Sequence, residues 1–245
     1  THPELLDYLA NRLVDGGWKL KDLHRLICTS KAYQMSSEIN ESSSSIDPAN
    51  DLFWRFDSRR LSAEEVRDSI LAVNESLNRE SYGPSFYPSL SAEVLAGQSK
   101  PGQGWGNSSE AERNRRSVYI HVKRSLLTPL LSAFDFPEPD TTCEARFATL
   151  QPGQAMSLLN SDFIHEEADK LAKSVRSRLP ADADSTAFVS AVIEQVLMRP
   201  ALDIEIEEGV ELIDELIAKY EVAPERANAL YALSVMNWNE FVFVF

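Results

Sequence analysis

The chain has 245 residues, of which 43% are hydrophobic and 25% are charged, and its formal net charge at pH 7 is −14. This composition is typical of a globular protein with enough residues for one large helical domain or two smaller ones. The acidic balance argues against a general nucleic-acid binder, and no apolar run approaches the roughly 18 residues of a membrane-spanning helix. Because the first residue is Thr1 and not Met, we expect the chain to be a piece of a larger protein.

The first part of the chain predicts two amphipathic helices, over residues 1–14 and 18–33, because leucines recur in both at helical spacing. The pair Gly16-Gly17 separates them, as glycines commonly do at the end of a helix. The serine run 42–45 predicts a polar loop, and residues 47–50 predict a turn.

Two cysteines are present, Cys28 and Cys143. Cys28 lies among apolar residues of the second predicted helix, so we expect it to be buried as a small hydrophobic side chain. Cys143 falls in a predicted loop, and two cysteines alone indicate neither a disulfide nor a cellular compartment.

The middle of the chain has one clear helix signal, which a long irregular region follows. Ser62 and Glu65 have the spacing of a capping box, which predicts a helix that ends near Leu77. Residues 80–112 are rich in glycine and proline and predict a long irregular loop. Residues 117–123 alternate apolar and polar side chains, which predicts a short strand or an extended segment.

The long loop is unusual because it contains aromatic residues, which disordered segments usually lack. Two interpretations stay open: the aromatic side chains anchor the loop to the core, or they stack on the sugar rings of a ligand. The residues concerned are Tyr82, Phe86, Tyr87 and Trp105.

From residue 151 the chain predicts helices to its end. One runs from Pro152 to Pro180, a second is capped by Ser185, an acidic third spans 204–220, and a fourth starts at Pro224. The predicted fold is therefore mainly α, a multi-helical domain with a long irregular loop and at most one or two short strands. We expect a main helical domain over 1–179, with the loop excursion 80–112, and a helical subdomain over 180–245 packed on it; a single domain over 1–245 is the alternative.

The sequence has no GxSxG elbow, P-loop, Rossmann glycine fingerprint, HExxH motif or CxxCH haem-attachment motif, so no catalytic residue and no cofactor are predicted. His165 shares one helical face with Asp162 and Asp169, a spacing that suits a metal ion. Without a second His or Cys cluster, however, a solvated helix face explains this pattern, and no metal site is predicted.

The most unusual feature is a basic segment, residues 113–124, which contains five Lys or Arg and no acidic residue in a strongly acidic chain. A second group of arginines lies at 55–67, beside Glu64 and Asp68. Arginines pair bidentately with carboxylates, so one interpretation is an ion-pair network within the fold. The other is a cleft that binds an anion or a sugar acid. Its candidate ligand-binding residues are Arg55, Arg59, Arg60, Arg115, Arg116, Tyr119 and Trp105.

Several short segments, in this order and spacing, resemble the planctomycete domain of unknown function 1553, the C-terminal module of planctomycete cytochrome-c-like multidomain proteins. The resemblance covers nearly the whole chain. It is carried by residues 1–10, 23–27, 29–30, 33, 48–50, 54–55, 59–61, 64, 67–68, 115–119, 134–137, 154–155, 158–160 and 239–241.

The resemblance implies a parent protein that is exported and extracytoplasmic, in the periplasm or at the cell surface, and a domain that begins upstream of this chain. It implies the cytochrome-c-like and companion modules of the same polypeptide as partners, with polysaccharide as a further one, and it supplies no catalytic residues. Three functions are compatible with it: an interaction or ligand-binding module, a domain that binds or processes carbohydrate or anions at the arginines and the aromatic loop, and a structural spacer. Whether the chain is an enzyme stays open.

Overall fold

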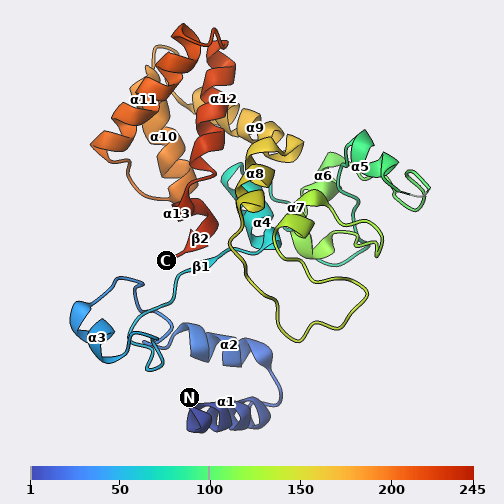
Figure 1. Ribbon diagram of the computed structural model, residues 1–245, viewed down its shortest axis with the longest axis vertical. Helices are drawn as coiled ribbons and strands as arrows, with labels where there is room; N and C mark the ends of the chain where they lie inside the picture. The colour runs from blue at the N-terminus through green and yellow to red at the C-terminus, as the bar shows by residue number, and fades with distance from the viewer. Residues whose placement is uncertain (1, 99) are drawn as a thin grey trace. The chain divides into compact units, whose positions relative to one another are not determined.

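The computed structural model describes residues 2–98 and 100–245. Thr1, the first position of the first predicted helix, and Ser99, one position of the predicted loop 80–112, lie outside the described residues. The structure is mainly helical (Figure 1), which confirms the predicted fold class. Two-residue strands, β1 (Arg59–Arg60) and β2 (Phe243–Val244), form its two-stranded sheet.

The chain divides into two units: an N-terminal unit of Thr1–Arg59 with Phe243–Phe245, and a main unit of Arg60–Val242. The predicted boundary between 179 and 180 does not coincide with this division, because residues on both sides of it belong to the main unit. Whether 180–245 forms a subdomain of its own stays a prediction. Among the described residues, no helix is long and apolar enough to cross a membrane.

In the N-terminal unit, α1 (Pro3–Asp15), α2 (Leu20–Cys28) and α3 (Glu41–Ile46) follow one another. The predicted loop at 42–45 is wrong: these serines lie in α3, because the side chain of Asn40 caps this helix by accepting the N–H of Ser43 at 3.1 Å. The prediction for Cys28 is also wrong, since its side chain is exposed. The physical reason is that α2 has α1 as a neighbour but neither helix buries a residue.

The main unit contains a bundle of four long helices, with the short helix α13 (Asn239–Val242) after them. In Figure 1, α10, α11 and α12 lie side by side, and α9 lies next to α12. Their apolar faces form a core in which Leu171, Phe188, Val192, Ile193 and Tyr231 are at most 1% exposed. The bundle helices are α9 (Asp162–Arg178), α10 (Ser185–Leu197), α11 (Asp203–Ala218) and α12 (Pro224–Val235).

Two predicted helix boundaries in this part are wrong. The helix expected from Pro152 to Pro180 is two helices, α8 (Pro152–Asn160) and α9, because Ser161 adopts an extended conformation between them. α10 is capped by Asp184 and not by Ser185, since the Asp184 carboxylate accepts the N–H of Ala187 at 2.9 Å.

The part of the main unit that precedes the bundle, residues 60–161, starts with α4 (Ala63–Val73). The predicted capping box of Ser62 and Glu65 is confirmed, although α4 ends four residues before Leu77. Two short helices, each capped by a serine, begin within the predicted loop 80–112. A 3-10 helix and one more short helix follow this loop. In chain order, these elements are α5 (Ala92–Ala96), α6 (Glu110–Arg113), η1 (Ser117–Tyr119) and α7 (Pro129–Ala133).

Of the two alternatives for residues 117–123, the strand is wrong, and an extended segment describes only the residues after Tyr119. The residues up to Tyr119 form η1, and only isolated bridges follow, between Phe86 and Ile120 and between Lys123 and Leu126. Asp68 explains the difference, because its carboxylate accepts both the N–H (2.8 Å) and the hydroxyl (2.7 Å) of Ser117. A backbone N–H that is bound in this way is not available to a neighbouring strand.

Candidate ligand-binding cavity

Arg67 on α4 connects the helix to the basic segment. It is 7% exposed, and its guanidinium donates to the carbonyls of Arg113 and Arg115 and to the hydroxyl of Ser117. Burial lowers the pKa of Arg67 to about 10, an effect that Asp68 (3.6 Å away) and then Glu167 oppose. At this pKa the side chain stays cationic at neutral pH, so a buried charge is held mainly by backbone oxygens.

Arg115 is engaged in a similar way. It is 5% exposed, donates to the carbonyls of Tyr82 and Pro84 (2.8 Å), and lies 4.0 Å from the ring centroid of Tyr119. The Tyr119 hydroxyl in turn accepts the N–H of Tyr82 at 2.7 Å, and this bond lowers the pKa of Tyr119. Arg115 and Tyr119 therefore hold the start of the long loop against the body of the main unit.

Arg116 differs from its neighbour because its side chain is exposed. Its guanidinium lies 5.9 Å from the ring centroid of Tyr119, and it has no ion pair with a carboxylate among the described residues. The structure thus brings three of the predicted site residues together, Arg115, Arg116 and Tyr119. Of these, the Arg116 guanidinium is accessible to solvent.

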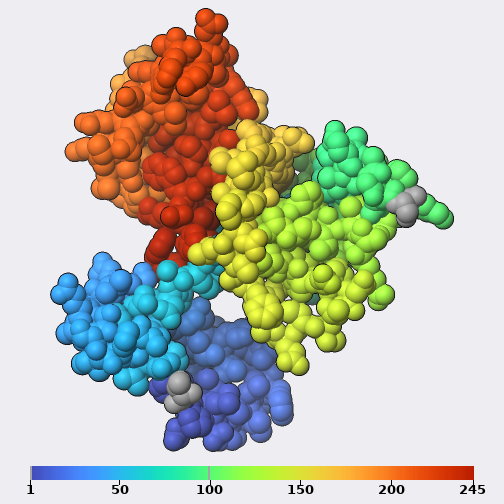
Figure 2. Space-filling model, in the orientation of Figure 1, coloured from blue at the N-terminus to red at the C-terminus, as the bar shows by residue number. Residues whose placement is uncertain are grey.

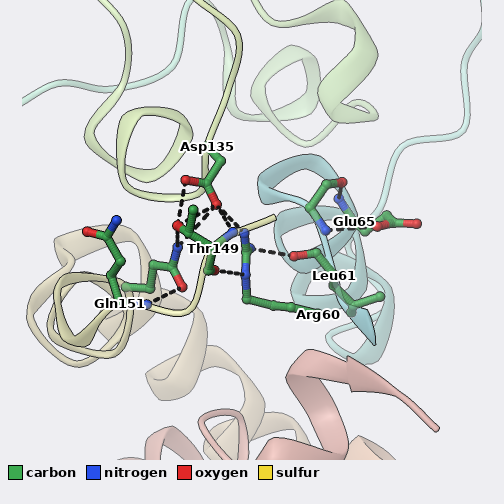
Figure 3. A network of polar contacts seen from close by, with 8 residues as sticks. Arg60, Leu61, Glu65, Asp135, Thr149 and Gln151 are labelled. Carbon is green, nitrogen blue, oxygen red and sulfur yellow. Dashed lines mark hydrogen bonds and ion pairs between the residues drawn. The ribbon is translucent and has the colours of Figure 1, made fainter. Parts of the chain in front are cut away.

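Arg60 belongs to a separate polar network, shown in Figure 3. Its guanidinium donates to Asp135 (2.8 Å) and to the carbonyls of Thr149 (3.2 Å) and Leu61 (2.7 Å). The Asp135 carboxylate also accepts the N–H and the hydroxyl of Thr149, each at 2.8 Å, and the Thr149 N–H is the main cause that lowers the pKa of Asp135. This network ties together the two ends of the exposed loop 136–148.

The other predicted site residues lie elsewhere. Arg55 and Arg59 belong to the N-terminal unit, where Arg55 pairs with Asp57 at 3.1 Å and lies over the ring of Trp54. Trp105 packs with Tyr87 and His121 at centroid distances of 5.7 Å, and its Nε1 donates to the carbonyl of Pro88 at 3.1 Å. Binding of an anion by the seven predicted residues stays a prediction.

The aromatic residues of the long loop have distinct environments. Phe86 is 1% exposed, whereas Tyr82 is 85% exposed. Tyr87 and Trp105 are half-buried against His121. Phe86, Tyr87 and Trp105 thus anchor the loop, the first of the two interpretations, whereas Tyr82 has no such packing.

His165 and Asp169 also have a partner within the fold. Arg226 of α12 lies 3.1 Å from the His165 ring nitrogen Nδ1 and 3.0 Å from the Asp169 carboxylate. In the described part of the chain no three His, Cys, Asp or Glu side chains are grouped so that they could hold a metal ion.

A cavity of about 890 Å³ lies within the main unit, lined by residues between Arg67 and Lys173. In Figure 2 the surface of α8 and α9 (yellow) adjoins that of α5 and α6 (green), the helices that contribute to its walls. Its volume is at the upper end of the range of small-molecule sites. The apolar lining includes Leu90, Val94, Ile120, Leu130, Met156 and Phe163, and the charged lining includes Glu110, Arg113, Asp162, Glu166, Glu167, Lys170 and Lys173.

One group of charges in the wall is internally neutralised. The Lys170 ammonium lies between the carboxylates of Glu167 (2.8 Å) and Glu110 (3.0 Å), and Glu167 also accepts the side-chain N–H of Asn74 at 2.7 Å. Burial disfavours the charged form of Lys170, but the hydrogen bonds to Glu167 and Glu110 outweigh it and raise the pKa of Lys170. Lys170 is consequently a fixed cation and a poor nucleophile or base.

Other charges of the wall have no such partner. Asp162, Glu166 and Lys173 line the cavity from α9, are exposed to solvent, and make no ion pair or side-chain hydrogen bond among the described residues. These groups are available to a ligand that carries complementary charges or hydrogen-bonding groups.

None of the seven predicted site residues lines this cavity. The sequence-based prediction relied on a local excess of basic residues, whereas the cavity wall combines acidic and basic residues. The cavity was therefore not predicted. The usable signal in the sequence was the charge order on one face of α9, where Asp162 and Glu166 precede Lys170 and Lys173.

The profile of a protein family named PSD1, described as "Protein of unknown function (DUF1553)", matches residues 1–213 of the chain. No curated protein and no solved structure matches the chain.

Proposed function

The chain belongs to the PSD1 family of unknown function (DUF1553), as its sequence resemblance predicted, and we propose that it is a ligand-binding module. Because the family has no known function, this proposal is based on the cavity of the chain itself. The observation that carries this proposal is the cavity of about 890 Å³ with three unpaired charged side chains in its wall. Charges without internal partners contribute little to the fold and are free to bind a ligand.

A cavity-filling substitution tests this proposal. Ser157 lines the cavity from α8, so Ser157→Trp should occupy part of it, whereas Ser177→Trp places the same side chain on an exposed position of α9 outside it. We expect a thermal-shift screen against short peptides, oligosaccharides and sugar acids to yield ligands that stabilise the wild type and Ser177→Trp but not Ser157→Trp. A screen without any ligand sensitive to Ser157→Trp would contradict the proposal.

A second candidate function is binding of an anion or an acidic carbohydrate at Arg116 and Tyr119. It is favoured by one observation, the exposed Arg116 guanidinium without a carboxylate partner beside the Tyr119 ring. Because Arg115 holds the loop, the informative substitution is Arg116→Ala. Binding of sulfated or uronic-acid oligosaccharides that is lost in Arg116→Ala, but retained in Ser157→Trp, would support this candidate over the cavity.

The biological setting is proposed from the family resemblance alone. We place the parent protein outside the cytoplasm, in a planctomycete, with the cytochrome-c-like and companion modules of the same polypeptide as partners and polysaccharide as a further one. Co-purification of this chain with the separately expressed modules tests the first partner class. If neither a ligand nor a module binds, the spacer function takes precedence.

A further inference from the structure

The charges on the cavity wall are ordered along α9. Asp162 and Glu166 lie in the N-terminal half of the helix, and Lys170 and Lys173 follow on the same face, at spacings of three to four residues. Acidic residues near the start of a helix and basic residues near its end also stabilise it through the helix dipole. In the cavity, the same order leaves an anionic end and a cationic end.

The accessible charges are the outermost ones. Lys170 is neutralised by Glu110 and Glu167, whereas Asp162 and Glu166 at one end and Lys173 at the other make no ion pair among the described residues. Lys173 lies eleven positions after Asp162, and at a rise of 1.5 Å per residue this places the two ends about 16 Å apart. A small compact ion cannot reach both ends.

The wall between these ends suits a polypeptide. Met156 and Phe163 provide apolar surface, and Asn114 and Asn160 also line the cavity, although the Asn160 amide already donates one N–H to the Met156 carbonyl at 2.9 Å. An amide both donates and accepts hydrogen bonds, as the backbone of a bound peptide requires. An extended chain rises about 3.3 Å per residue, so a span of about 16 Å corresponds to five residues.

We propose that the cavity binds an extended peptide segment that presents a basic side chain to Asp162 and Glu166 and, about five residues away, an acidic side chain to Lys173. This inference rests on the proposed function of the cavity and names its ligand class. Recognition depends on the order and spacing of two opposite charges and not on the net charge of the peptide.

The test uses blocked seven-residue peptides with a Ser-Gly-Asn background, and charged residues at positions 1 and 6. Four versions are compared by calorimetry with the whole chain: Lys then Glu, Glu then Lys, two Lys, and two Glu. We expect one of the mixed peptides to bind most tightly, with each lost ion pair weakening binding about two- to five-fold, the effect of exposed ion pairs. A preference for neither mixed peptide would overturn the proposal.

Substitutions in the wall assign the two ends. Glu166→Gln should weaken the binding only of peptides that contain Lys, and Lys173→Gln should weaken the binding only of peptides that contain Glu. The double substitution E166K/K173E should transfer the preference to the other mixed peptide. Glu208→Gln is the matched control, because Glu208 is an exposed, unpaired carboxylate on α11 outside the cavity. All these positions are exposed, so the substitutions should leave the stability of the fold nearly unchanged.

The outcomes separate the two proposals. If the peptides do not bind, or if their binding is insensitive to Glu166→Gln and Lys173→Gln, the peptide is the wrong ligand class or binds elsewhere, and this inference fails. The proposed function would still stand if another ligand stabilised the wild type but not Ser157→Trp. If no ligand distinguishes Ser157→Trp from Ser177→Trp, both fail.

Discussion

Two regions of the main unit, the bundle α9–α12 and the loop-rich segment 80–121, are stabilised in different ways. In the bundle, side chains such as Phe188, Ile193 and Tyr231 are at most 1% exposed and form an apolar core. The loop-rich segment has one comparable apolar anchor, Phe86, and otherwise depends on buried guanidiniums that donate to backbone carbonyls.

This difference follows from the local sequence. A helix satisfies its own backbone hydrogen bonds, so its side chains are free to form an apolar core. A segment interrupted by glycine and proline leaves carbonyls without partners, and Arg67 and Arg115 supply the missing donors. Basic residues that look like a ligand site in the sequence therefore stabilise irregular backbone in the structure.

The strongest test of the apolar part of this comparison is Phe188→Ala. Phe188 is 0% exposed, packs beside Tyr231 at a centroid distance of 6.4 Å, and lies under the guanidinium of Arg176. Its truncation should lower the free energy of unfolding by about 3–5 kcal/mol, measured by urea denaturation. A loss below about 1 kcal/mol would show that the bundle does not depend on this core.

The polar part of the comparison is tested by Arg115→Ala beside Arg116→Ala. The first removes the donors to the carbonyls of Tyr82 and Pro84 and should cost about 2–3 kcal/mol, because hydrogen bonds to charged groups are strong. It should also speed proteolysis within residues 80–106. Arg116 is exposed, so its removal should cost less than about 0.5 kcal/mol. Equal effects of the two substitutions would refute the distinction.

Close packing in the bundle is tested by Gly209→Ala. A methyl group at Gly209 would lie 2.8 Å from both Tyr231 and Val189, so α11 must shift and stability should fall by about 2 kcal/mol. Gly153 in α8 is the matched control, because nothing lies within 4 Å of the added methyl there. Gly153→Ala should be neutral or slightly stabilising in a thermal melt. If Gly153→Ala were destabilised as well, close packing would not explain the loss of stability in Gly209→Ala.

The smallest expected effect concerns the Arg60–Asp135 network and depends on pH. The Thr149 N–H is the main cause that lowers the pKa of Asp135, so the unfolded chain takes up a proton on this residue at a higher pH than the folded chain. This stabilisation is present above the ordinary aspartate pKa of about 3.9 and is lost as the pH falls below it. Asp135→Asn should cost about 1 kcal/mol at pH 6 and less at pH 3, measured by urea denaturation.

The exposed carboxylate of Asp214, which has no ion pair among the described residues, provides the control for this pH series. Asp214→Asn should change stability little at either pH. If the cost of Asp135→Asn were equal at pH 6 and pH 3, the charge of Asp135 would not be the stabilising feature.

Local signals in the sequence predicted much of the helical fold. The capping box at Ser62 and Glu65 and the proline at the start of α12 act within one helical turn, so no distant contact is needed to recognise them. The prediction failed where a distant or competing partner decides the local conformation. Residues 117–123 are not a strand because Asp68, from another element, binds Ser117.

By itself, the sequence determined the mainly α fold, the family and the position of most helices, because periodic apolar residues and caps are encoded within a few neighbouring positions. Only the tertiary structure decided which charges find partners. Arg67 and Arg115 are occupied by carbonyls, whereas Asp162, Glu166 and Lys173 line a cavity without a partner among the described residues. The availability of a charged side chain depends on contacts between segments far apart in the chain, and no spacing along the sequence records those contacts.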